Sequence, residues 1–329
     1  SLSWALCWSQ YPTLLSARSI QRVHCSDGRE NMKTKEEKRF QVFSHVVLIV
    51  FALFCIIPLI LLLMSSFEEN STLIREGYGF WPKSFSFEAY EYLFRHGGQI
   101  FTSYFVTFFV TVVGTAVSIV LTTMLAYPLP RDDLLGRKVL GFLVFFTMLF
   151  NGGLVPTYLI YTNTLHLKNT VWAVIVPRLL LGAYYVLLMK SFFTTSIPKA
   201  IIEAAKVDGA GEYRILVQVI VPMSKPIIAT VLMLTAINYW NDWYNGFIYI
   251  TTKTEYYTIQ ALLNRMLQDI QYLSNNAATM GNISESVSKI PSTSVRMAIS
   301  VVGLLPILIV YPFVQNSFVK GITLGAVKG

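Results

Sequence analysis

Charged residues are scarce in this sequence. They make up 13% of its 329 residues, whereas a soluble globular protein carries roughly a quarter. Apolar residues reach 54%, and the mean hydropathy is +0.53. This composition excludes an ordinary soluble domain and predicts an all-α integral membrane protein. The net charge of +8 does not favour nucleic acid as a partner, because the basic residues do not gather on one amphipathic face and positively charged cytoplasmic loops explain them better.

Cysteine is also sparse, and the common catalytic motifs are missing. The three cysteines, Cys7, Cys25 and Cys55, lack a spacing typical of metal ligands. The sequence contains no phosphate-binding loop, no HExxH and no nucleophile elbow. We therefore expect no enzymatic activity, no ATP hydrolysis, and no metal or cofactor on this chain. The absence of a convergent catalytic set also disfavours a membrane enzyme.

Six apolar runs are long enough to cross a hydrocarbon core of roughly 30 Å as helices. They cover about residues 43–64, 103–129, 139–161, 170–192, 226–248 and 296–314. Asn151-Gly152-Gly153 and Pro156 interrupt the third run, and broken backbone at membrane depth is typical of segments that line a cavity or pack within protein. The sequence therefore predicts a transmembrane domain of six helices within residues 32–329.

Residues 1–31 fit this pattern poorly, because they show neither a helical stripe nor the pure apolar core of a signal peptide. The stretch that begins at Met32, with Lys33, Lys35, Lys38 and Arg39, has the character of a natural start. We expect residues 1–31 to be an N-terminal extension that is poorly ordered or not native. The alternative is an amphipathic segment that lies on the membrane surface.

The distribution of lysine and arginine predicts the orientation. From Met32 onward, fourteen of them fall in the start, the loop after the second run, the segment after the fourth run and the tail, whereas eight fall in the longer opposite set of loops. Loops rich in lysine and arginine remain in the cytoplasm. We therefore expect both termini and the segment after the fourth run to be cytoplasmic.

That segment, Pro198–Pro226, is polar, lies between two apolar runs, and has the sequence signals of a helical hairpin. Ser196 can cap a helix, Pro198 suits a first turn, and glycine at Gly209 can end the helix because it tolerates left-handed dihedral angles. A second short helix is expected to begin near Glu212 and to stop before Pro222. The small Ala204-Ala205 pair would let the surface of another protein approach the helix closely.

Glu203-Ala204-Ala205, followed by Asp208-Gly209-Ala210 and by Ile220, Pro222 and Pro226, resembles the EAA loop of the membrane subunits of binding-protein-dependent ABC importers. The resemblance implies the type I permease fold. It also implies that the loop is a coupling helix that docks in a cleft of a separate ATPase subunit. The docking residues would be Glu203, Ala204, Ala205, Asp208 and Gly209. A hairpin without a partner, simply joining two membrane spans, is the alternative.

Further stretches resemble carbohydrate permeases of the group that serves uronic-acid oligosaccharides. One stretch begins at Asn151, a second begins at Asn241, and a third begins at Leu305 and continues towards the C-terminus. The similarity extends from about residue 40 onward. It implies a bacterial cell-membrane location and a heterodimer with a second, related permease. It also implies two copies of a cytoplasmic ATPase, which would hold ATP and magnesium, and an external solute-binding lipoprotein.

Two intramembrane features indicate a path for the cargo. Arg178 lies inside the fourth run, where an arginine needs water or a partner. The fifth apolar run carries amides, a carboxylate and indole rings. Such groups can form hydrogen bonds with sugar hydroxyls and pack against the apolar faces of sugar rings. The candidate residues are Arg178, Asn238, Trp240, Asn241, Asp242, Trp243 and Asn151. An interfacial aromatic belt with a structural Arg178–Asp242 ion pair is the alternative.

Two further questions stay open at this point. The segment Thr251–Ser294 could be a flexible loop or a contact surface for a sugar-binding protein, and we favour the contact surface. A secondary transporter or channel without an ATPase is the competing class of function. Such carriers usually show repeated halves with paired broken helices, and we find no internal repeat of this kind.

Overall fold

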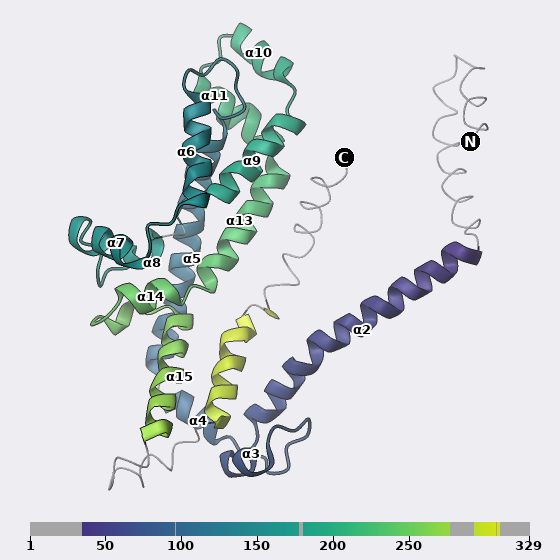
Figure 1. The fold of residues 1–329 in the computed structure, drawn as a ribbon, viewed down its shortest axis with the longest axis vertical. Coiled ribbons are helices and arrows are strands. Elements are labelled where there is room, and N and C mark those ends of the chain that lie inside the picture. The colour runs from purple at the N-terminus through teal and green to yellow at the C-terminus, as the bar shows by residue number, and fades with distance from the viewer. Residues whose placement is uncertain (1–34, 96, 178–179, 277–292, 307, 310–329) are drawn as a thin grey trace. The chain divides into compact units, whose positions relative to one another are not determined.

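The computed structural model describes residues 35–95, 97–177, 180–276, 293–306 and 308–309 (Figure 1). Within these ranges the chain is almost entirely helical, and the β contact there is one isolated bridge between Glu68 and Phe85. The chain divides into two compact units, Ser1–Leu61 and Leu62–Gly329. The helical architecture agrees with the all-α membrane fold that the sequence predicts.

The first unit contains most of helix α2, which runs from Lys35 to Ser66. From Arg39 onward this helix is long and apolar enough to cross a membrane. Its large apolar side chains, such as Phe43 and Phe54, are exposed. A helix that is apolar on all sides is suited to a lipid environment. The predicted first span, residues 43–64, therefore lies within one continuous helix.

Helix α5, Gly97–Ala126, is the central element of the second unit. It is thirty residues long and apolar enough to span a membrane. It packs against α4 (Glu88–Arg95), α9 (Ala183–Ser196), α13 (Lys225–Trp240) and α15 (Ile259–Asn276). The sequence predicted this helix over residues 103–129. It ends earlier, at Ala126, because Pro128 and Pro130 cannot continue it.

Within the described residues, three apolar clusters hold this unit together. The first joins the end of α5 to α9, α13 and α11 (Glu212–Ile215), with Met189 and Ile215 fully buried. The second lies around Tyr239 and joins the middle of α5 to α8 (Trp172–Ile175) and α14 (Tyr244–Tyr249). The third joins α4, α15 and the helix of residues 293–306. α5 therefore connects all parts of the core.

The predicted third span, residues 139–161, is not one straight helix. Helix α6 covers Arg137–Leu149, and α7 begins only at Leu154 and continues through a π-helical turn to Thr164. The two parts meet at an angle of 114°. Asn151 Oδ1 accepts a hydrogen bond from the backbone of Gly153, whose φ of +82° suits glycine and not a residue with a side chain. The predicted interruption is confirmed, and it turns the chain sharply.

Two other predicted spans are also broken. In residues 170–192, α8 ends at Ile175 and the next described helix, α9, begins at Ala183. Pro177, which cannot donate a backbone hydrogen bond, follows the end of α8. In residues 226–248, α13 ends at Trp240, and the separate helix α14 begins at Tyr244. Asp242 accepts the backbone hydrogen bond of Asn245 at that start. How often the chain crosses the membrane stays a prediction.

The segment Thr251–Ser294 is not simply a flexible loop. A 3₁₀ turn at Thr254–Tyr256 leads into α15, and Ile259, Leu262 and Ile270 of this helix are buried. Residues 277–292 lie outside the described ranges, as do residues 1–34 and the tail from residue 310. The predicted sixth span, 296–314, begins within the helix of residues 293–306. The part of that span beyond residue 309 also lies outside the described ranges.

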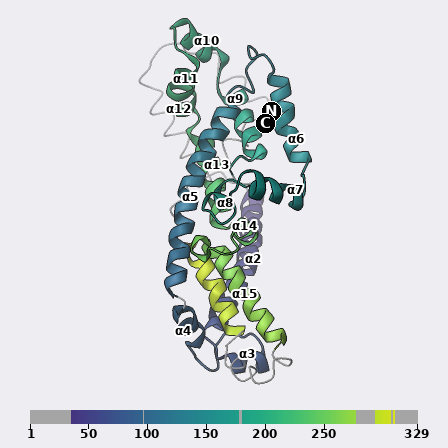
Figure 2. The ribbon, with the colours of Figure 1, turned by 90° about the vertical axis from the view of Figure 1, so that its left-hand side faces the viewer.

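The polar ends of the second unit lie far apart in the fold. Helix α10, Lys199–Val207, and α11 lie at one end in both Figure 1 and Figure 2. Helices α3 (Asn70–Glu76) and α4 lie at the other end. The sequence assigned these two groups to opposite faces of the membrane, and their separation is compatible with that assignment.

Candidate functional site

The hairpin after α9 folds much as its turn residues predict. Helix α10 begins at Lys199 after Pro198, and Gly209 ends it with a φ of +76°. The N–H groups of Gly209 and Ala210 donate to the carbonyl oxygens of Lys206 and Ala205, both over 3.0 Å. These bonds use carbonyl groups that the end of the helix would otherwise leave without partners.

Two details of the hairpin differ from the prediction. Ser196 is the last residue of α9 and does not cap α10, because Pro198 holds the capping position. The second arm begins at Glu212 as predicted, but it does not stop before Pro222. It continues through a π-helical turn, Leu216–Ile220, into α12, Val221–Met223. Pro222 lies in the first turn of α12, where a missing backbone donor costs little.

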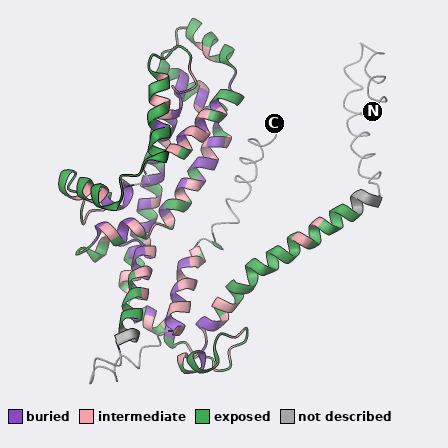
Figure 3. Cartoon of the chain, in the orientation of Figure 1, coloured by how far each residue is buried: buried purple, intermediate pink, exposed green. Residues whose placement is uncertain are grey.

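Helix α10 has one face towards the protein and one towards solvent (Figure 3). Ile202 and Ala205 pack against the first apolar cluster. Glu203 and Ala204 are exposed, and Val207 is 87% exposed. The two alanines of the motif therefore differ in role. Ala205 packs α10 against the rest of this protein, whereas Ala204 places only a small side chain on the exposed face beside Glu203.

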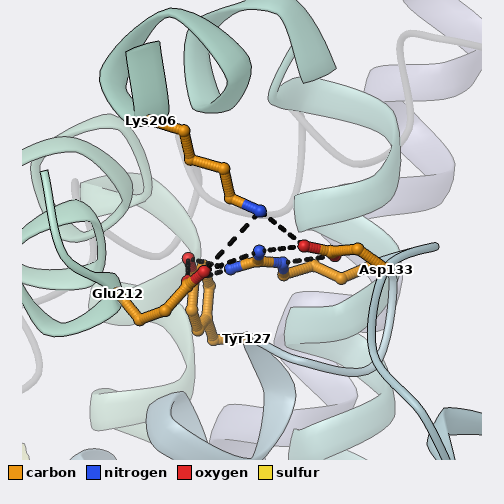
Figure 4. A network of polar contacts seen from close by, with 5 residues as sticks. Tyr127, Asp133, Lys206 and Glu212 are labelled. Atoms are coloured by element: carbon orange, nitrogen blue, oxygen red, sulfur yellow. Dashed lines mark hydrogen bonds and ion pairs between the residues drawn. The ribbon is translucent and has the colours of Figure 1, made fainter. Parts of the chain in front are cut away.

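An ionic network links the hairpin to the loop that follows α5. The guanidinium of Arg131 donates to Glu212 Oε1 over 2.8 Å, to Asp133 Oδ1 over 3.0 Å and to Tyr127 Oη over 2.6 Å. Lys206 forms ion pairs with Asp133 and, over 3.6 Å, with Glu212. Figure 4 shows the side chains of Lys206, Glu212, Asp133 and Tyr127 pointing towards one common centre.

A second set of ion pairs lies beside this network. Asp132 pairs with Lys199, the first residue of α10, and with Arg137, the first residue of α6. Three consecutive loop residues, Arg131, Asp132 and Asp133, therefore hold both arms of the hairpin. From the sequence, these charges were interpreted only as the end of the second predicted span. Their link to the hairpin was missed because the paired residues lie 67 to 81 positions apart.

The network lowers the pKa values of its carboxylates. Hydrogen bonds from Arg131 and then Lys206 hold the pKa of Asp133 far below its ordinary value of 3.8. The hydrogen bond from Arg131 likewise lowers the pKa of Glu212 below 4.5. Because these pKa values are depressed, the attraction is fully present above the ordinary carboxylate range and is lost only as the pH falls towards the depressed values. The network is therefore ionised throughout the neutral range.

A hollow of about 320 Å³ opens beside the network. It is bounded by the loop after α5, the end of α9 and one side of α10, and its lining includes Phe193, Ile202 and Glu203, which is also exposed to solvent. Within the part of the chain that the structure describes, no group of three or more histidine, cysteine, aspartate or glutamate residues could hold a metal ion. The expectation of no metal or cofactor stays a prediction.

The predicted cargo residues that the structure describes have different local contacts. Asn151 bonds within its own turn, and Asn238 on α13 donates to Tyr185 Oη on α9 over 2.5 Å. Arg178 lies outside the described residues, so neither its cargo role nor its pairing with Asp242 is tested. Trp240 is half-buried.

Asp242 has a clear local role at the break between α13 and α14. Its carboxylate accepts the N–H of Asn245 over 3.3 Å, and its carbonyl oxygen accepts the hydroxyl of Thr258 over 2.9 Å. Asn245, which is buried, donates in turn to the carbonyl oxygen of Pro177 over 3.0 Å. These bonds join the break after α8 to the break after α13, so the two interruptions stabilise each other.

Asn241 and Trp243 line a separate hollow of about 370 Å³. Gln260 and Asn264 on α15 and Ser300 on the helix of residues 293–306 contribute polar groups to it. Amides, a hydroxyl and an indole ring can bind the hydroxyl groups and the apolar ring face of a sugar. Sequence reasoning missed Gln260 and Asn264, although their spacing of four residues places them on one face of a helix.

Comparison with known proteins identifies the family. Residues 101–324 match the family described as binding-protein-dependent transport system inner membrane component. The polygalacturonan/rhamnogalacturonan transport system permease protein YtcP of Bacillus subtilis (strain 168) is 37% identical over 294 residues, which cover 89% of this chain and 100% of that protein. Protein LplC of the same organism is 35% identical over 296 residues, 90% of this chain and 97% of that protein.

A solved structure shares the fold. It is the crystal structure of a bacterial ABC transporter involved in the import of the acidic polysaccharide alginate, with a TM-score of 0.68 and 28% identity. The match covers 87% of this chain and 99% of that chain. The chain belongs to the family of binding-protein-dependent transport system inner membrane components, and it is a multi-pass permease subunit of an ABC importer.

Proposed function

We propose that this permease imports oligosaccharides that carry carboxylate groups, and that a separate ATPase drives it through the hairpin of α10 and α11. The outer face of α10 carries the proposal. Glu203 and Val207 are exposed there, and Glu203 forms no hydrogen bond or ion pair within the described ranges. A charged anchor beside a shallow alanine face is suited to insertion into a cleft of a partner.

The proposal of an acidic cargo is supported by the relatives. The name of the relative at 37% identity includes polygalacturonan, and that of the solved structure includes the acidic polysaccharide alginate. A carboxylate on each sugar would give Arg178 a counter-ion, which an arginine at membrane depth needs. Asn241, Trp243, Gln260 and Asn264 would supply hydrogen bonds and a stacking face to the neutral parts of the same sugars.

The full assembly would contain a second, related permease, two copies of the ATPase and an external solute-binding lipoprotein. Closure of the ATPase pair on ATP would draw the hairpins together and turn the cavity towards the binding protein. The hairpin and both termini would face the cytoplasm, in line with the excess of lysine and arginine on that side. The nucleotide and its magnesium would be held by the ATPase subunits.

Uptake into proteoliposomes tests the proposal. The complete complex should import an oligogalacturonide only when ATP is present on the ATPase side, and faster than a neutral oligosaccharide of the same length. Arg178→Ala should reduce import of the acidic sugar and leave the neutral one unchanged, because only the acidic sugar loses a counter-ion. Arg265→Ala, at an exposed arginine of α15 that contacts Tyr257 and does not line the hollow of Asn241 and Trp243, is the matched control.

Two results would contradict parts of this proposal. Uptake that continues without ATP would indicate a secondary carrier or channel. An unchanged preference between acidic and neutral sugars in Arg178→Ala would remove Arg178 from cargo recognition.

A further inference from the structure

Arg131 occupies an unusual position for a residue in a loop between helices. Its side chain is only 10% exposed, whereas those of its partners Asp133 and Glu212 are 52% and 57% exposed. Its guanidinium carbon lies 5.2 Å from the centre of the Tyr127 ring. Arginine presents several donors in a rigid plane, so a guanidinium that binds two carboxylates and a phenol fixes the geometry of all three.

The groups that Arg131 joins belong to different moving parts of a transporter. Tyr127 and Asp133 belong to the chain that leaves α5, and Pro128 and Pro130 restrict the backbone between Tyr127 and Arg131. Glu212 begins α11, the second arm of the hairpin. Lys206, in the last turn of α10, reaches both Asp133 and Glu212. The network therefore ties both arms of the hairpin to the end of α5.

α5 is in turn held tightly to α13. A β-carbon placed on Gly114 would lie 2.5 Å from the ring of Tyr239 on α13, and Tyr239 donates to the carbonyl oxygen of Ile175 over 2.9 Å. The covalent chain connects the hairpin only to α9 and α13, and an 84° bend separates its second arm from α13. The ionic network, together with the apolar contacts of Ile202, Ala205 and Ile215 in the first cluster, connects the hairpin directly to the end of α5.

We propose that Arg131 is a positioning residue for energy coupling: it fixes the coupling hairpin to the end of α5, so that a displacement of the hairpin moves α5 together with α13. The inference rests on the proposed function. Arg131 faces the body of its own protein and needs no contact with the ATPase. Its loss should therefore leave docking intact and weaken the transfer of motion.

The test compares import with ATP hydrolysis in proteoliposomes that contain the complete complex. In Arg131→Ala, the ATPase should copurify as in the wild type, and ATP hydrolysis should continue. The amount of sugar imported per ATP hydrolysed should fall roughly tenfold, a factor within the usual range for coupling between two sites. Glu212→Gln, which keeps the size of the side chain and one acceptor oxygen but loses the charge and the second acceptor, should show a smaller fall in the same ratio. Adding Glu212→Gln to Arg131→Ala should cause little further loss, because the two changes remove one interaction.

Two controls separate this role from a purely structural one. Arg95→Ala removes an exposed i,i+4 ion pair on α4, at the opposite end of the unit, and should leave the ratio unchanged. Ethylguanidinium added to Arg131→Ala should restore part of the ratio, because the adjacent hollow, which Arg131 lines, gives it access to the vacated position. If Arg131→Ala lowered the ratio only by destabilising the protein, ethylguanidinium would not restore it.

The outcomes are distinct. An unchanged import-to-ATP ratio in Arg131→Ala would overturn the inference. A loss of bound ATPase in both Arg131→Ala and Glu212→Gln, in proportion to the loss of import, would also overturn it, because it would place these residues in docking. If the wild-type complex itself imports sugar without ATP, the proposed function fails instead.

Discussion

Glu203→Lys should abolish ATP-driven import while the chain still folds and inserts into the membrane. Within the described residues Glu203 forms no hydrogen bond or ion pair, and its side chain is exposed on α10. Its charge therefore contributes little to the fold of this protein. In the proposed complex the same carboxylate meets the ATPase, and breaking a buried charge pair across an interface costs about 2–5 kcal/mol, with further repulsion from the reversed sign.

The measurement is retention of the ATPase on the tagged permease, followed by uptake in proteoliposomes. Both should fall to background in Glu203→Lys, whereas the amount of folded permease in the membrane should match the wild type. Glu255→Lys, at an exposed glutamate in the 3₁₀ turn before α15, is the matched control and should retain both activities. Full ATPase retention in Glu203→Lys would exclude Glu203 from the docking surface.

Gly114→Ala should destabilise the permease strongly for a change of one methyl group, because the contact between α5 and α13 leaves no room for it. Its β-carbon would lie 2.5 to 2.8 Å from three carbon atoms of the Tyr239 ring, which is fully buried. The ring cannot withdraw without losing its hydrogen bond to Ile175, and it is surrounded by the second apolar cluster. Overpacking of this kind costs about 1–3 kcal/mol, and Gly114→Val should cost more.

Thermal unfolding of the purified permease in detergent measures this effect. The midpoint should fall in Gly114→Ala and fall further in Gly114→Val. Gly98→Ala, in the same helix, is the control, because no atom lies within 4 Å of the position its β-carbon would take. That variant should unfold at or slightly above the wild-type midpoint, since alanine is favoured over glycine in a helix. A wild-type midpoint for Gly114→Ala would show that α5 and α13 are not in close contact there.

The parts of the fold that the sequence predicted are those set by neighbouring residues. Pro198, Gly209 and Glu212 mark the limits of the hairpin arms, because proline and glycine act on the backbone where they stand. Asn151-Gly152-Gly153 marks the break after α6 for the same reason. A run of apolar residues likewise identifies α2 and α5, whose length matches a membrane.

The parts that the sequence missed depend on contacts between distant residues. The breaks after α8 and α13 are joined by the bond from Asn245 to Pro177, 68 positions apart, and a count of apolar residues does not detect such a bond. α15 was missed because its polar residues resemble those of a loop, although its apolar residues follow a helical spacing and are buried. The partners of Arg131 likewise lie on separate elements and come together only in the folded chain.

Labelling of single cysteines by a membrane-impermeant thiol reagent tests the central claim most directly. In a background without the native cysteines, Val207→Cys would report the tip of α10, which is 87% exposed, and Trp81→Cys would report the segment between α3 and α4, where Trp81 is 82% exposed. A hairpin driven by a cytoplasmic ATPase predicts that Trp81→Cys reacts in intact cells and that Val207→Cys reacts only after the membrane is opened. Reaction of Val207→Cys in intact cells would place the hairpin outside the cell and contradict the account.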